Sequence, residues 1–255
     1  MPTEFAYVQA RAQARHGDRL SEESWRLLGS SRGLSNYLHT VRSTALAPHV
    51  QHFSASSSPH MIERSLRHDW SAEVATASHW VPEVWRVAVQ WATWLPYLPL
   101  LAHLLDGKPP LPWMLEDALL ADFESHHDAR RLAAGIAPPG AAWRETKGDL
   151  LESWLIHWQT LWPPTDATGR AGLMALLALL RRASAPADGA APGRAENRQR
   201  RRELEMRTGR MLRLQGQQPV TVFCHLLLSA SELLRLREGL LRRALYNDVA
   251  EAGRP

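Results

Sequence analysis

The amino-acid sequence predicts an all-α protein. Leu, Ala and Arg are abundant whereas Val and Ile are sparse, and apolar residues recur at intervals of three and four rather than in strict alternation. Proline and glycine gather in short segments between these stretches, where they end helices. We therefore expect a multi-helix protein, built as an elongated or funnel-like array of short helical modules.

Capping residues and apolar spacing locate the helices along the chain. Phe5, Val8 and Ala12 share one face of the first helix, and Ser21 is a suitable N-cap for the second, with acidic residues in its first turn. Pro219 is typical of the first turn of the last helix. Helices are expected over residues 5–16, from 21, and over 34–43, 61–80, 83–94, 115–134, 149–162, 170–182, 195–214 and 219–246, with a loop over 45–58.

Two breaks suggest how the chain is organised. The segment 184–194 is small, rich in proline and glycine, and reads as a linker, and KPPLPW at 108–113 interrupts any helix. The predicted parts are N-terminal helical modules over 1–106, a central module over 107–183, the linker over 184–194 and C-terminal helices over 195–255.

The run from 87 to 105 raises the question of a membrane span. Its 19 residues carry no formal charge, which is close to the roughly 20 residues that a transmembrane helix needs. However, Gln90 and His103 are polar, and Pro96 and Pro99 interrupt backbone hydrogen bonding. We interpret the run as buried core, with contact to a membrane surface as the alternative.

Other bulk features point to a cytoplasmic protein. The N-terminal segment has no apolar leader, and a single cysteine, Cys224, excludes an intrachain disulfide and a cysteine-based zinc site. Cys224 lies in an apolar run and reads as a buried, inert thiol. The 11 tryptophans indicate large core side chains or rings at an apolar–polar boundary, and neither interpretation requires a ligand.

Motifs for catalysis and cofactor binding are missing from the sequence. We find no phosphate-binding loop, no dinucleotide fingerprint and no zinc-protease signature. Glu124 and His127 form one Glu-x-x-His pair, but a di-iron helical bundle needs two. His49, His52 and His60 cluster around the predicted loop. We expect a non-enzyme without cofactors, and a helical enzyme with an unmarked site is a further hypothesis.

The helix predicted over 195–214 is strongly basic. Its arginines include Arg198, Arg200, Arg201, Arg202 and Arg207, interspersed with Glu196, Glu203 and Glu205. Such a run fits the solvated face of a helix, an acidic protein partner, or anionic lipid headgroups. Nucleic acid is less favoured, because the run lacks interleaved aromatic residues. In the last helix, Glu232 and Glu238 are spaced to pair with Arg235 and Arg242.

Four segments resemble the C/d family of V-type ATPase subunits, the helical central-stalk component of rotary ATPases. They are FAYVQARAQARHGDRLSEESWRLL at 5–28, LSNYLHTV at 34–41, MIERSLRHDW at 61–70, which contains Glu63 and Leu66, and PVTVFCHLLLSASELLRLREGLL at 219–241. In the last segment Glu232 precedes the Leu236-Arg237 pair, as in the family's closing helix. The chain is shorter than usual for the family, and residues 106–194 show no match.

The resemblance implies a peripheral, non-catalytic V/A-type ATPase component on the cytoplasmic face of the membrane. Such a component seats the rotor axle on the membrane ring and couples ATP turnover to ion flow. Candidate contacts with these partners are Arg11, Arg15, Glu232, Arg235 and Arg237, although ordinary surface or intrachain pairing is an alternative for each. The rival hypothesis is a stand-alone helical adaptor or membrane-surface protein that binds an acidic partner through its Arg-rich helix.

Overall fold

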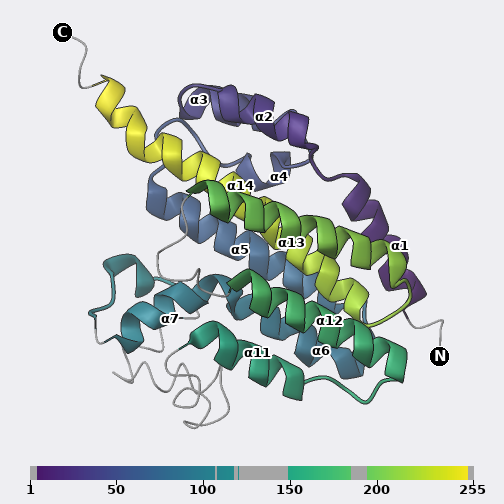
Figure 1. Cartoon of the computed structure of the whole chain (residues 1–255). Coiled ribbons are helices and arrows are strands. Elements are labelled where there is room, and N and C mark those ends of the chain that lie inside the picture. The colour runs from purple at the N-terminus through teal and green to yellow at the C-terminus, as the bar shows by residue number, and fades with distance from the viewer. Residues whose placement is uncertain (1–4, 107, 118–119, 121–148, 185–193, 252–255) are drawn as a thin grey trace. The chain divides into compact units, whose positions relative to one another are not determined.

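The computed structural model describes residues 5–106, 108–117, 120, 149–184 and 194–251, and every regular element within these ranges is a helix (Figure 1). The predicted all-α class is thus confirmed. Contacts divide the chain into two compact units, Met1–Glu73 with Ala187–Pro255, and Val74–Pro186. This division differs from the modules predicted in chain order, because the first unit joins the two ends of the chain.

The first unit is organised around the long C-terminal helix. It contains α1 (Ala6–Gly17), α2 (Glu22–Ser30), α3 (Leu34–Val41), α4 (Ala47–Val50), most of α5 (Pro59–Ser78), α13 (Arg194–Leu214) and α14 (Val220–Glu251). Helices α1, α3 and α13 pack on α14, and α13 runs alongside it (Figure 1). The N- and C-terminal parts of the chain therefore share one core.

Local signals accompany three helix starts in this unit. The Ser21 hydroxyl caps α2 by accepting from the backbone N–H of Ser24 at 3.1 Å, as expected. Gly33 precedes α3 with φ 70°, a conformation that costs glycine little. The one-turn helix α4 lies within the expected loop, where Pro48 occupies the first turn and presets its backbone angle.

A close approach between α3 and α14 depends on the absence of a side chain. A Cβ atom built on Gly239 would lie 2.2 Å from the Tyr37 hydroxyl oxygen and 2.6 Å from its Cζ. Tyr37 is buried, together with Leu236 and Leu240 on the same helix as Gly239. Glycine at this position thus lets the tyrosine ring reach the backbone of α14.

The second unit contains four α-helices and two 3-10 helices among its described residues, besides the end of α5. They are α6 (Glu83–Gln90), the 3-10 helix η1 (Trp91–Tyr97), α7 (Leu98–Leu105), η2 (Pro112–Met114), α11 (Leu150–Thr160) and α12 (Ala167–Ser184). The uncharged run at 87–105 is divided among α6, η1 and α7, and Pro96 lies in η1. Among the described residues, no helix has both the length and the hydrophobicity that crossing a bilayer requires. Most of the helix and linker expected at 115–134 and 184–194 lie outside the described residues.

Tryptophans hold α11 to the start of η1. The Trp91 indole donates to the Trp154 carbonyl oxygen at 3.3 Å, and the Trp154 indole donates to the Trp91 carbonyl oxygen at 3.2 Å. Trp154, Trp158 and Trp162 follow each other at helical spacing, with successive ring centroids 5.8 and 4.9 Å apart. Trp91, Trp154 and Trp158 are buried, which fits the interpretation of the tryptophans as core side chains, whereas Trp162 is half-buried.

Candidate functional site

The candidate contact residues on α14 all form ion pairs within the first unit. Glu232 accepts the backbone N–H of Leu20 at 3.1 Å and lies 3.4 Å from the Arg19 guanidinium. Arg235 pairs with Glu22, lies 4.0 Å from Glu205, and stacks over the ring of Trp25 at 4.5 Å. These bonds tie α14 to α13 and to the start of α2.

Arg237 connects α14 to α5. Its Nε donates to Glu63 Oε2 at 2.9 Å, and Glu63 also lies 3.8 Å from Arg67 one turn along the same helix. Glu63 and Arg237 come from two of the segments that carry the family resemblance, although 174 positions separate them in the chain. Arg237 remains 44% exposed, so its intrachain pair does not cover it, and the partner contact stays a prediction.

The two candidate arginines of α1 are exposed. The Arg11 guanidinium lies 5.9 Å from the ring centroid of Tyr7 on the same helix. Arg15 lines a small cavity that is formed by α1, the α3–α4 connection, α5, α13 and α14. Partner contact by these two residues also stays a prediction.

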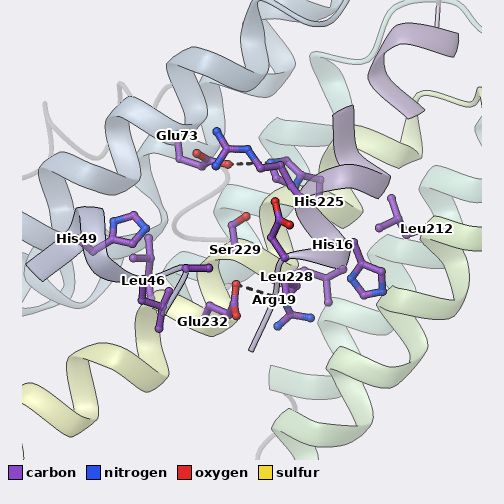
Figure 2. Close-up of a pocket in the computed structure, with 14 residues that line it drawn as sticks. His16, Arg19, Leu46, His49, Glu73, Leu212, His225, Leu228, Ser229 and Glu232 are labelled. Atoms are coloured by element: carbon purple, nitrogen blue, oxygen red, sulfur yellow. Dashed lines mark hydrogen bonds and ion pairs between the residues drawn. The ribbon is translucent and has the colours of Figure 1, made fainter. Parts of the chain in front are cut away.

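That cavity is lined by polar side chains that pair with one another (Figure 2). His225 of α14 lies 2.9 Å from Glu73 of α5, and Arg19 points to Glu232 across the opening. His49 lies 3.0 Å from Asp69 of α5. The cavity holds about 80 Å³, against roughly 300–1,000 Å³ for typical ligand pockets.

The charge states in the cavity suit bracing more than proton transfer. The hydrogen bond from His225 lowers the pKa of Glu73, outweighing the effect of burial. Burial lowers the pKa of His16, and the nearby Arg19 and Arg213 lower it further. A carboxylate with a lowered pKa is a weak base near neutral pH. These pairs connect α14 to α5, α4 to α5, and α14 to the segment that follows α1.

The cysteine and the histidines that the sequence singled out do not form a metal site within the described residues. Cys224 is buried, and burial raises its pKa to about 12, which keeps the thiol protonated. His52 lies 2.5 Å from the Ser65 hydroxyl. Within the described residues, no three His, Cys, Asp or Glu side chains gather as metal ligands would. Glu124 and His127 lie outside the described residues.

A second hollow, the arginine groove, lies between α13 and α14 against α2 and α3. Its volume is about 270 Å³. It is lined by Trp25, Leu28, Gly29, Tyr37, Arg198, Arg201, Arg202, Arg235, Glu238, Gly239, Arg242 and Arg243. Six arginines thus face one lining carboxylate, Glu238.

The basic helix α13 divides into two faces. Arg200 and Arg207 pair with Glu196 and Glu203 one turn earlier on the same helix. The remaining three named arginines line the groove instead: Arg198, Arg201 and Arg202. The expected surface therefore narrows to one side of α13, joined by arginines of α14.

Sequence reasoning missed the groove because its walls come from distant segments. The guanidinium of Arg243 donates to the carbonyl oxygens of Leu28, Gly29 and Ser31 at 2.9–3.1 Å and lies 4.0 Å from the centroid of the Tyr37 ring. The pairs expected within α14 were Glu232–Arg235 and Glu238–Arg242. Glu232, Arg235 and Glu238 instead pair with residues of other segments. Arg201 lies 3.3 Å from Glu238, and Arg202 lies 3.6 Å from Glu22.

Comparison with known proteins gives no relative for this chain: no protein-family model, no curated protein and no solved structure matches it.

Proposed function

We propose that the chain is a non-catalytic helical connector, specifically a central-stalk component of a V/A-type rotary ATPase that links the rotor axle to the membrane ring. One observation carries this proposal. The four segments that resemble the C/d family of V-type ATPase subunits lie far apart in the chain, and all four contribute helices to the first unit. Their packing together is expected if the resemblance reflects a shared fold.

The ion pairs of α14 support a mechanical role. A component that transmits torque needs helices that resist sliding past one another, and charged hydrogen bonds at fixed positions add directional resistance to apolar packing. Helix α14 is linked in this way to three other parts of the unit through Glu232, Arg235 and Arg237. In this proposal these residues hold the protein rigid, and their exposed sides remain open to partners.

The decisive experiment is purification of the tagged full chain from membranes of its native host after mild cross-linking. We expect identified ATPase catalytic and rotor subunits to co-purify in constant proportion, and deletion of the gene for this chain to uncouple ATP hydrolysis from ion transport. Recovery of the chain without these subunits, together with unchanged coupling in the deletion strain, would contradict the proposal.

A charge-swap series tests the mechanical part. Arg237→Glu places two carboxylates opposite each other at the α5–α14 contact and should weaken coupling. The combined variant Arg237→Glu with Glu63→Arg restores opposite charges and should recover it. If the combined variant couples no better than the single one, the pair is not a brace.

The arginine groove favours a second candidate, a stand-alone helical adaptor for an acidic partner. The groove concentrates six arginines where two helices meet, and such a field attracts acidic surfaces and speeds their association. This candidate predicts partner capture that needs no ATPase subunits. The native-membrane purification distinguishes it from the stalk component, since only the latter requires those subunits to be present.

A further inference from the structure

We propose that the arginine groove binds an acidic peptide segment of a protein partner, with Arg198 and Arg242 as its main contacts. This inference rests on the proposed role as a connector and names the surface and chemistry of one of its contacts. The groove was not apparent from the sequence, in which the arginines of α13 and α14 belong to separate segments.

Two of the six lining arginines are available to a ligand. Four of the six lining arginines are engaged: Arg201 with Glu238, Arg202 with Glu22, Arg235 with Glu22 and Glu205, and Arg243 with backbone carbonyls. Arg198 and Arg242 are exposed and form no ion pair or hydrogen bond with the part of the chain that the structure describes. These two side chains line the same groove from α13 and α14.

Aromatic rings hold two of the lining guanidinium groups in place. Arg235 stacks over Trp25 at 4.5 Å, and Arg243 over Tyr37 at 4.0 Å, so both guanidinium groups are held by aromatic rings. Arg243 is a cation whose own partners are neutral carbonyls, and it adds uncompensated positive charge. Burial, chiefly, lowers the pKa of Arg243, and Arg242 beside it contributes, as expected where positive charge is crowded.

The groove suits carboxylates that are carried on a peptide. The groove already accommodates carboxylates, because Glu22 and Glu238 meet its arginines from within the chain. Its lining also includes Leu28 and Gly29, and a Cβ atom built on Gly29 would meet no atom within 4 Å, so this position leaves room for a ligand backbone. A segment with acidic side chains and small residues therefore matches the groove in both charge and shape.

The test uses the purified full chain and a fluorescent eight-residue peptide of alternating Glu and Gly. At low salt we expect saturable binding that weakens steeply as salt rises. The variant Arg198→Gln with Arg242→Gln should lose about tenfold or more in affinity, since each arginine–carboxylate contact contributes on the order of a few-fold or more.

The matched control is Arg200→Gln with Arg207→Gln, which removes the same charge from α13 outside the groove. It should keep peptide affinity within about twofold, and an equal loss in both double variants would overturn the proposal by showing non-specific attraction. Circular dichroism verifies that each variant is folded.

Two competitors identify the ligand class. Inorganic pyrophosphate and vesicles containing phosphatidylserine should displace the peptide less effectively than an unlabelled copy of the peptide at equal charge. Tighter binding of either competitor at Arg198 and Arg242 would replace the acidic peptide with a phosphate or membrane ligand and so overturn the proposal. Because this assay contains no ATPase subunits, its failure is separate from failure of co-purification.

Discussion

The two units hold their helices together in different ways. In the first, charged side chains connect helices that are far apart in the chain, as Arg19–Glu232 and Arg237–Glu63 do. In the second, indole rings fill the contact between η1 and α11, and Trp91 and Trp154 exchange hydrogen bonds with each other's backbone. Buried aromatic contacts stabilise in proportion to the apolar area that they remove from water, and salt has little effect on them. Partly exposed ion pairs each contribute little free energy but fix the position of one helix against another.

The largest effect is expected from Trp154→Ala in the second unit. Loss of the buried indole leaves a cavity and removes its hydrogen bond to the Trp91 carbonyl, which should cost about 3–5 kcal/mol of unfolding free energy. Trp154→Phe keeps most of the volume and should cost about 1–3 kcal/mol. Urea unfolding with segment-resolved hydrogen exchange measures both, and equal losses would show that the hydrogen bonds, rather than the ring volume, hold α11.

Next in size is Gly239→Ala in the first unit. The new methyl group would collide with the Tyr37 ring, so we expect a loss of about 1–3 kcal/mol from overpacking. The matched control is Gly29→Ala, because a Cβ there meets no atom within 4 Å. That control should gain up to about 1 kcal/mol from helix propensity. If Gly239→Ala is as stable as Gly29→Ala, the close approach of α3 and α14 is wrong.

Double-mutant cycles compare two ion pairs of the first unit. Arg19 and Glu232 are 18% and 13% exposed, whereas Arg237 and Glu63 are 44% and 24% exposed. We therefore expect a coupling energy of about 1–3 kcal/mol for Arg19–Glu232 and below about 1 kcal/mol for Arg237–Glu63. Thermal unfolding of the alanine variants at low and high salt measures both. A larger coupling for the exposed pair would reverse the expected order.

The fold class and most helices could be predicted from the sequence, because caps and apolar spacing are local. Ser21 capping α2 is one case. The proline-containing 87–105 run is divided as expected, although α6 ends at Gln90 rather than at residue 94 and Pro96 lies inside η1. The ion pairs between different helices could not be predicted, because spacing in the sequence reveals only neighbours in the same helix. Glu232 was spaced to pair with Arg235, yet it pairs with Arg19, which lies near the other end of the chain.

The arginine groove shows the same limit for the candidate site. The arginine density of α13 was visible in the sequence, but its division into a self-paired face and a groove-lining face depends on where α14 lies. Arg243 and Tyr37 gave no signal, because their contact requires the α3–α14 packing around Gly239. Candidate residues were therefore found where charge is locally dense and missed where the site is assembled from distant segments.

The smallest expected effect is a difference in pH dependence between the units. Burial lowers the pKa of His16 in the first unit and of His157 in the second. In both cases the unfolded chain binds the proton more readily. The contribution of each histidine to the free energy of unfolding is therefore fully present above its unfolded pKa of about 6.5. It is lost as pH falls through the lower pKa of the folded state.

His16→Gln should thus flatten the loss of stability below about pH 6.5 for segments of the first unit, and His157→Gln for segments of the second. Segment-resolved hydrogen exchange at a series of pH values measures each slope, and His39→Gln, at an exposed position, provides the control. Glu73, whose pKa is lowered chiefly by its bond to His225, adds a further loss at more acidic pH in the first unit. The pKa of Glu205 is raised, mainly by burial, and its contribution has the opposite sign, so it partly offsets the histidine slope in the first unit. Equal flattening of both units by either variant would mean that the two cores unfold together.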